Sequence, residues 1–285
     1  MLAYTFDKRY DNRRNSNEGV IGIRIISICP SNTELAAYLN LTTELVGIDD
    51  YSDWPDSIQH LPRLGPDLSI NMDLVEELSP DLVLASLSVP GMEKNVEELE
   101  KRGIPHVVYQ PNTLQEIADN LLDLGKRTGK VEEAKAYVAK YKATLDAYKQ
   151  FTSTIKKRKK LYWEWWPKPV FTPGKFNWLT EISRLAGGIN IFEDVELASV
   201  QTSWEDVLTR QPDEICLAWV GVRTTKVKPE AVHKRPGWPS LEAVKENKIH
   251  VLEEALFCRP SPRLLEGLEK LTFLLWGDAP KGFKR

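Results

Sequence analysis

Cysteine and histidine are scarce in this chain. Its 285 residues include three cysteines, Cys29, Cys216 and Cys258, and four histidines. An odd number of widely separated cysteines does not form a disulfide framework, and their spacing is not that of a metal site. We therefore expect buried thiols, no disulfides and no bound metal.

The chain also lacks an excess of charge of either sign. Lys and Arg number 38 against 41 Asp and Glu, and the pI is near 5.9. Nucleic-acid binding needs a basic surplus or stripe, so we expect no nucleic-acid partner. The basic run at 156–160 is interpreted as cations at the C-terminal end of a helix, where the helix dipole favours them.

Long apolar runs are missing as well. No stretch is long enough to cross a bilayer, and residues 1–21 are polar and charged, without the apolar stretch of a secretory signal. From this we predict a flexible arm at 1–21, no direct membrane insertion and, for the sequence as it stands, a cytoplasmic location.

The motifs of common enzyme classes are absent too. The sequence has no GxSxG, HExxH, CxxC, Walker loop or GxGxxG. His106 and His250 each begin an apolar run, where a structural histidine is the commoner case. The sequence predicts a non-catalytic protein without a cofactor.

Short β-branched runs alternate with amphipathic segments through most of the chain, which predicts largely parallel sheets covered by helices. In the first half, Ser31 or Asn32 is the expected cap of a helix with Glu34 in its first turn, and Asn71 and Thr113 are the expected starts of two later helices. The predicted strands cover 23–29, 44–48, 81–86, 106–110, 161–166, 214–220 and 248–252.

Residues 131–155 form one long amphipathic pattern, with apolar residues three and four positions apart. A helix of this length spans roughly 37 Å. We predict an α/β fold of two Rossmann-like lobes, 22–128 and 160–285, joined by this backbone helix at 129–159. Residues 167–177 are expected to form a loop. Glu164, between two tryptophans, is interpreted as a ligand contact, the alternative being a side chain that only points outward from its strand.

The chain resembles a known family over residues 23–276. The matching stretches are RIISICPSNTELAAYLNLTTELVGIDDYSDWP, EWWPKPVFTPGKFNWLTEISRLAGGINIF, SWEDVLTRQPDEI and FCRPSPRLLEGLEKL. They are similar to cobalamin-binding proteins of ATP-driven (ABC) importers, within a helical-backbone class that also holds siderophore and haem receptors. The resemblance implies capture of cobalamin or a related corrinoid in a cleft between the lobes, and it implies a location outside the cytoplasm, where the family usually acts.

The same resemblance implies which side chains meet the ligand. Tyr51 and Trp54 would face it from the first lobe, Trp165 and Phe171 from the second, and Arg259 would contact its polar rim. Flat aromatic rings suit the broad, partly apolar faces of a corrin. Further candidates, at strand ends or in matching loops, are Trp166, Trp178, Trp219 and Phe257.

In the family, one acidic residue on each lobe docks onto the permease. The matching positions here are Asp73 and Glu205. Asp73 stands where glutamate is more usual, which shortens the reach by one methylene, and either carboxylate could instead serve only its helix N-terminus. We expect a monomer.

Two alternatives stay open at this point. One is a receptor of the same fold for an iron siderophore or haem, which a cationic cleft would favour. The other is a cytoplasmic protein that stores or senses corrinoids, or an enzyme or regulator on the same two-lobed frame.

Overall fold

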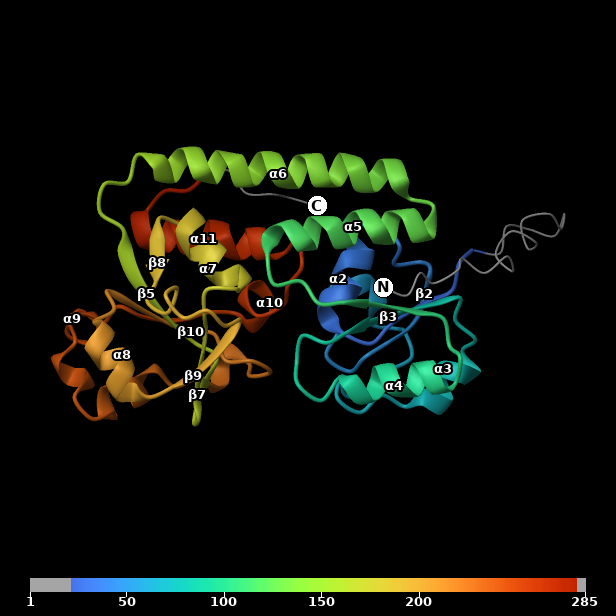
Figure 1. Cartoon of the computed structure of the whole chain (residues 1–285), viewed down its shortest axis with the longest axis horizontal. Coiled ribbons are helices and arrows are strands. Elements are labelled where there is room, and N and C mark those ends of the chain that lie inside the picture. The colour runs from blue at the N-terminus through green and yellow to red at the C-terminus, as the bar shows by residue number, and fades with distance from the viewer. Residues whose placement is uncertain (1–21, 281–285) are drawn as a thin grey trace, which may run out of the picture.

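The computed structural model describes residues 22–280, so the arm predicted at 1–21 lies outside the described part of the chain. Each half of the sequence builds one parallel sheet covered by helices, and one long helix runs across both halves (Figure 1). The predicted class, two α/β lobes joined by a long helix, is confirmed. The lobe boundaries at 22–128, 129–159 and 160–285 stay a prediction.

The first lobe has a four-stranded sheet in the order β2-β1-β3-β4, and each neighbouring pair is parallel. Two of its helices begin where capping residues predict. The Asn71 side chain accepts the backbone N–H of Leu74, and Thr113 and Glu116 form a capping box. The elements are β1 (Ile25–Ser27), α2 (Pro30–Tyr38), β2 (Leu45–Ile48), a 3₁₀ helix at Asp56–Ile58, α3 (Met72–Glu77), β3 (Leu82–Ser86), α4 (Glu93–Lys101), β4 (His106–Tyr109) and α5 (Leu114–Thr128).

The start of α2 differs from the prediction. Its N-cap is Cys29 and Pro30 is its first residue, so Ser31 and Asn32 lie inside the helix. Proline suits this position because its missing N–H would be unpaired there in any case. The Asn32 amide instead donates to the carbonyl of Ala85, which ties α2 to β3.

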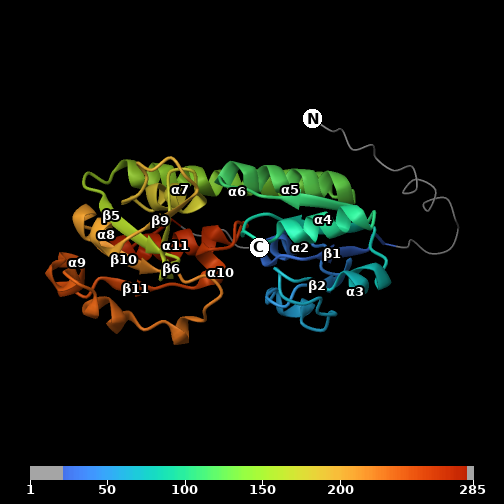
Figure 2. The ribbon, with the colours of Figure 1, turned by 60° about the horizontal axis from the view of Figure 1, so that its bottom comes forward.

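The helix α6 (Val131–Ser153) connects the lobes. Its 23 residues span about 34 Å at 1.5 Å per residue. It packs against α5 at one end and against α7 (Trp178–Leu185) at the other, as both views show (Figures 1 and 2). Tyr141 and Tyr148 on its buried face belong to a core that includes Leu35 of the first lobe and Leu268 of the second. The two lobes therefore share one apolar core along α6.

The second lobe has a parallel sheet in the order β11-β10-β5-β8. Its strands are β5 (Lys159–Glu164), β8 (Gly188–Asn190), β10 (Glu214–Leu217) and β11 (Ile249–Val251). Its further helices are α8 (Trp204–Arg210), α9 (Glu242–Lys245), α10 (Glu254–Phe257) and α11 (Leu264–Trp276), with 3₁₀ helices at Thr224–Lys226, Pro229–Lys234 and Trp238–Ser240.

The prediction of a loop at 167–177 is wrong. Strands β6 (Trp166–Pro167), β7 (Val170–Pro173) and β9 (Ser199–Thr202) form a small antiparallel sheet there. The strand predicted at 161–166 accordingly ends at Glu164, and Trp166 belongs to β6. This sheet places aromatic residues beside the carboxyl end of β5.

Candidate ligand-binding site

The turn after β2 carries Tyr51 at the carboxyl end of the first sheet. Asp49 fixes this turn, because its carboxylate accepts the backbone N–H of Tyr51 at 2.8 Å and the Ser52 hydroxyl at 2.5 Å. Arg63 adds a hydrogen bond to the Ser52 carbonyl at 2.6 Å. Tyr51 itself is 51% exposed, so the turn holds an open phenol ring on an ordered backbone.

Acidic residues surround this turn. Burial raises the pKa of Asp49 to about 6. Burial also raises the pKa of Asp67, and the negative charge of Glu254 in the second lobe adds to the shift. A charge in the second lobe therefore affects the ionisation of a carboxyl group in the first lobe.

Trp54 lies at the joint between the lobes. Its ring is 5.5 Å from that of Tyr38 in α2, and the guanidinium of Arg263 lies 4.7 Å from its centroid. Arg263 belongs to the second lobe, so this cation–π contact joins the two halves. Trp54 is half-buried in this arrangement.

Trp165, which lies between β5 and β6, comes together with Trp166 of β6 and Phe171 of β7. The backbone N–H of Trp165 donates to the Phe171 carbonyl at 2.9 Å, and Trp166 pairs with Phe171 across the antiparallel strands. Trp166 is 43% exposed. The indole Nε1 of the half-buried Trp165 is itself buried and has no hydrogen-bond partner in residues 22–280. These residues form an aromatic edge on the second lobe.

Trp219 follows β10 and is held by a buried ion pair. Its Nε1 donates to Glu164 at 3.1 Å, while Arg235 binds both oxygens of that carboxylate at 2.6 and 2.8 Å. Tyr162 adds its hydroxyl at 2.8 Å. Glu164 is fully buried. The expectation that Glu164 contacts ligand is therefore corrected, because its carboxylate is occupied in orienting Trp219.

Trp178 and Phe257 lie deeper than the prediction placed them. Phe257 is fully buried, with its ring 5.4 Å from that of Trp163, and its carbonyl accepts the Trp178 Nε1 at 2.9 Å. Trp178 is buried too, 6.1 Å from the ring of Trp165. Both rings pack in the main hydrophobic core, so they offer no surface to a ligand in this arrangement, and Trp178 packs against Trp165.

The sequence predicts Arg259 at the polar rim of the ligand, but in the structure its guanidinium lies among carboxylates. Arg259 is 8% exposed and pairs with Asp53 at 2.6 Å and Glu34 at 3.3 Å from the first lobe, and with Glu254 at 3.0 Å from its own. Arg263 pairs with Glu34 at 2.9 Å. Arg259 thus links the lobes through charge pairs, because three carboxylates surround it.

These charge pairs between the lobes are not among the predictions from the sequence. Glu34 was expected to serve the helix dipole in a first turn, yet it is buried and engaged with Arg263 and the Ser261 hydroxyl. A carboxylate between apolar residues, in TELAAYL, is the signal that points to a buried ion pair.

The two predicted docking acids lie in the first turns of short helices. Asp73 is in α3 and Glu205 is in α8. In Figure 1 these helices lie toward the outer ends of the molecule, on the side away from α6. Asp73 pairs with Arg102 at 2.7 Å while its side chain stays 87% exposed, and Glu205 is exposed.

Residues 22–280 hold no group of three His, Cys, Asp or Glu placed to bind a metal ion. The three cysteines are unpaired thiols. Burial raises the pKa of Cys29 to about 11, which keeps it protonated. No helix in the same range has both the length and the apolar character needed for a membrane crossing.

The periplasmic binding protein family model matches residues 25–256. The chain belongs to this family. Family membership confirms the resemblance inferred from the sequence.

Several periplasmic binding proteins are close in sequence. An uncharacterized ABC transporter substrate-binding lipoprotein of Bacillus subtilis, YvrC, is 30% identical over 268 residues, which is 90% of this chain and 81% of the relative. The vitamin B12-binding protein of Vibrio cholerae is 30% identical over 254 residues, 88% of each chain.

The crystal structure of the periplasmic vitamin B12-binding protein BtuF of Vibrio cholerae matches with a TM-score of 0.72 at 28% identity. The match covers 88% of this chain and 96% of that one. The names of these relatives include a lipoprotein and a periplasmic protein, which agrees with the location that the family resemblance implies and differs from the cytoplasmic location expected from the sequence as it stands.

Proposed function

We propose that this protein is the substrate-binding component of an ABC importer and captures a corrinoid between its two lobes, without a chemical step. The proposal is supported by a similarity in sequence to a vitamin B12-binding protein, taken together with the aromatic residues of the candidate site. A vitamin B12-binding relative matches 88% of the chain, and exposed or half-buried aromatic rings gather at the carboxyl ends of both sheets.

The proposed contacts are Tyr51 and Trp54 from the first lobe, and Trp165, Trp166, Phe171 and Trp219 from the second. Rings of this kind bury the faces of a broad, partly apolar macrocycle. A corrin is edged with amide groups, and their carbonyls are suitable acceptors for the unpartnered Nε1 of Trp165 once the ring turns to expose this buried atom. Arg259 reaches the ligand only if it leaves its carboxylate partners.

Asp73 and Glu205 are the proposed permease contacts. Each is an exposed carboxylate on one lobe, and the helices that carry them share the side of the molecule opposite α6 (Figure 1). Two arginine-bearing sites on a permease would meet such a pair of charges.

Parallel titrations of the purified protein with cyanocobalamin, haem and ferrichrome test the proposal. We expect one cyanocobalamin per chain, with a change in its visible absorbance and quenching of tryptophan fluorescence, because four of the proposed contact residues are tryptophans. Absence of any response to cyanocobalamin beside saturable binding of haem or ferrichrome would assign the protein to the iron-chelate receptors of the same fold.

A further inference from the structure

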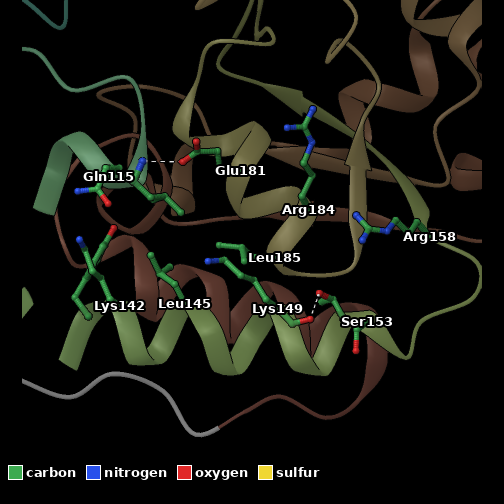
Figure 3. A pocket seen from close by; sticks show the side chains of 12 residues that line it. Gln115, Lys142, Leu145, Lys149, Ser153, Arg158, Glu181, Arg184 and Leu185 are labelled. Atoms are coloured by element: carbon green, nitrogen blue, oxygen red, sulfur yellow. Dashed lines mark hydrogen bonds between the residues drawn. The ribbon is translucent and has the colours of Figure 1, made fainter. Parts of the chain in front are cut away.

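A cavity of about 550 Å³ lies where the start of α5, the second half of α6 and α7 come together (Figure 3). Because α5 belongs to the first half of the fold and α7 to the second, the cavity spans the joint between them. None of the aromatic residues proposed to meet the corrinoid lines it. Its volume is within the usual range for small-molecule sites, roughly 300–1,000 Å³.

The floor of this cavity is apolar. Leu114, Tyr141 and Leu185 are buried in the main hydrophobic core, and Leu145 is half-buried against the same core. An apolar floor favours a ligand with an aliphatic or aromatic body.

The rim is cationic, with Lys142, Lys149, Arg158 and Arg184 around the floor. Lys149 and Arg184 already pair with neighbouring carboxylates at 2.8 and 3.1 Å. Neither Lys142 nor Arg158 has an ion-pair partner in the described part of the chain, and both are exposed. In Figure 3 these two side chains lie at opposite ends of the cavity, with Leu145 and Leu185 between them.

The lining of the cavity contains one carboxylate, that of Glu181, and this group already accepts a hydrogen bond. Its Oε2 accepts the backbone N–H of Leu114, at the start of α5, at 2.7 Å (Figure 3). Burial raises the pKa of Glu181. The cavity therefore keeps a surplus of positive charge over an apolar surface.

We propose that this cavity binds an amphiphilic anion, a molecule with a carboxylate, sulfonate or phosphate group on an aliphatic or aromatic body. The anionic group pairs with Lys142 or Arg158, and the body lies on Leu145 and Leu185. Such a ligand contacts both lobes beside the Glu181–Leu114 hydrogen bond, so its binding stabilises their present arrangement.

Calorimetric titration with dodecanoate, below its critical micelle concentration, tests this site. We expect saturable binding of one dodecanoate per chain, with the same affinity when the protein is saturated with cyanocobalamin. The variant Lys142→Glu/Arg158→Glu should bind about tenfold more weakly, because two attractions become repulsions. The matched control Lys140→Glu/Lys156→Glu has the same change in net charge outside the lining, and its affinity should change less than about twofold.

The proposal is overturned by absence of saturable binding, by equal affinities of the two double variants, or by competition from cyanocobalamin. Sedimentation with phosphatidylglycerol vesicles separates the possible sources of the anion. Retention on vesicles through Lys142 and Arg158, without binding of free dodecanoate, would mean a membrane contact instead of a cavity ligand. Vesicle and dodecanoate binding together would make a lipid one source of the anion. Corrinoid binding is measured independently, so failure of this site leaves the proposed function unaffected.

Discussion

The variant Glu164→Gln tests how much the buried Glu164–Arg235 ion pair contributes to the stability of the fold. Both side chains are almost fully buried, at 0% and 3% exposure, and Arg235 also lies 4.4 Å from the ring of Trp238. Removing one charge of a buried pair costs about 3–5 kcal/mol, because the partner stays charged without compensation. For a chain of this size we expect the melting temperature to fall by about 6–10 °C.

Thermal unfolding followed by circular dichroism measures this effect. A matched control in the same lobe is Glu242→Gln, whose exposed pair with Lys245 should contribute less than about 1 kcal/mol. The double variant Glu164→Gln/Arg235→Leu should regain part of the lost stability, because no lone guanidinium remains. Equal melting temperatures for the wild type and Glu164→Gln would refute the reasoning.

Four further predictions concern the ligand, the joint and the permease. Trp165→Ala should weaken cyanocobalamin binding by about 1–3 kcal/mol, since a ring contact is removed, and an unchanged dissociation constant would contradict the proposed site. Asp49 has a native pKa of about 6 against about 3.9 when unfolded; its contribution to stability is therefore greatest below pH 4 and is lost as pH rises through 6. Relative to Asp49→Asn, the wild type should lose on the order of 3 kcal/mol between pH 4 and 7 in urea unfolding, and parallel pH profiles would exclude this assignment. Asp73→Asn/Glu205→Gln should reduce corrinoid uptake by cells carrying the cognate importer while leaving ligand affinity intact; normal uptake would remove both residues from the docking surface. Small-angle scattering should change little on ligand binding, because α6 resists bending, and a marked decrease in the radius of gyration would disprove a rigid connection.

Local patterns were sufficient to predict the main elements of the fold. The alternation of strands and helices, the cap at Asn71, the capping box at Thr113 and the long amphipathic helix all depend on residues within a few positions of one another. Such signals can be recognised in a single sequence.

The small antiparallel sheet could not be predicted in the same way. Strand β6 has two residues, and β7 includes Pro173, so neither segment has a recognisable alternation. Their strand structure depends on pairing with each other and with β9, which lies more than 25 residues further along the chain. Only the folded chain brings these segments together.

The roles of the buried charges also depend on distant partners. Glu164 and Arg235 are 71 positions apart, and Glu34 and Arg259 are 225 apart. The sequence around one residue of such a pair does not identify its partner. Arg259 was consequently expected at a ligand rim, although three carboxylates surround it in the structure.

The helix α6 contains neither glycine nor proline over its 23 residues. Kinks in helices occur mainly at those residues, and hinge residues usually lie at element ends. Any rotation of one lobe relative to the other must therefore change backbone dihedral angles at the two connections, around Gly129 before α6 and at 154–158 after it. Gly129, with φ of 75°, and the residues next to Arg158 are thus the positions at which a change of sequence would alter how freely the two halves turn.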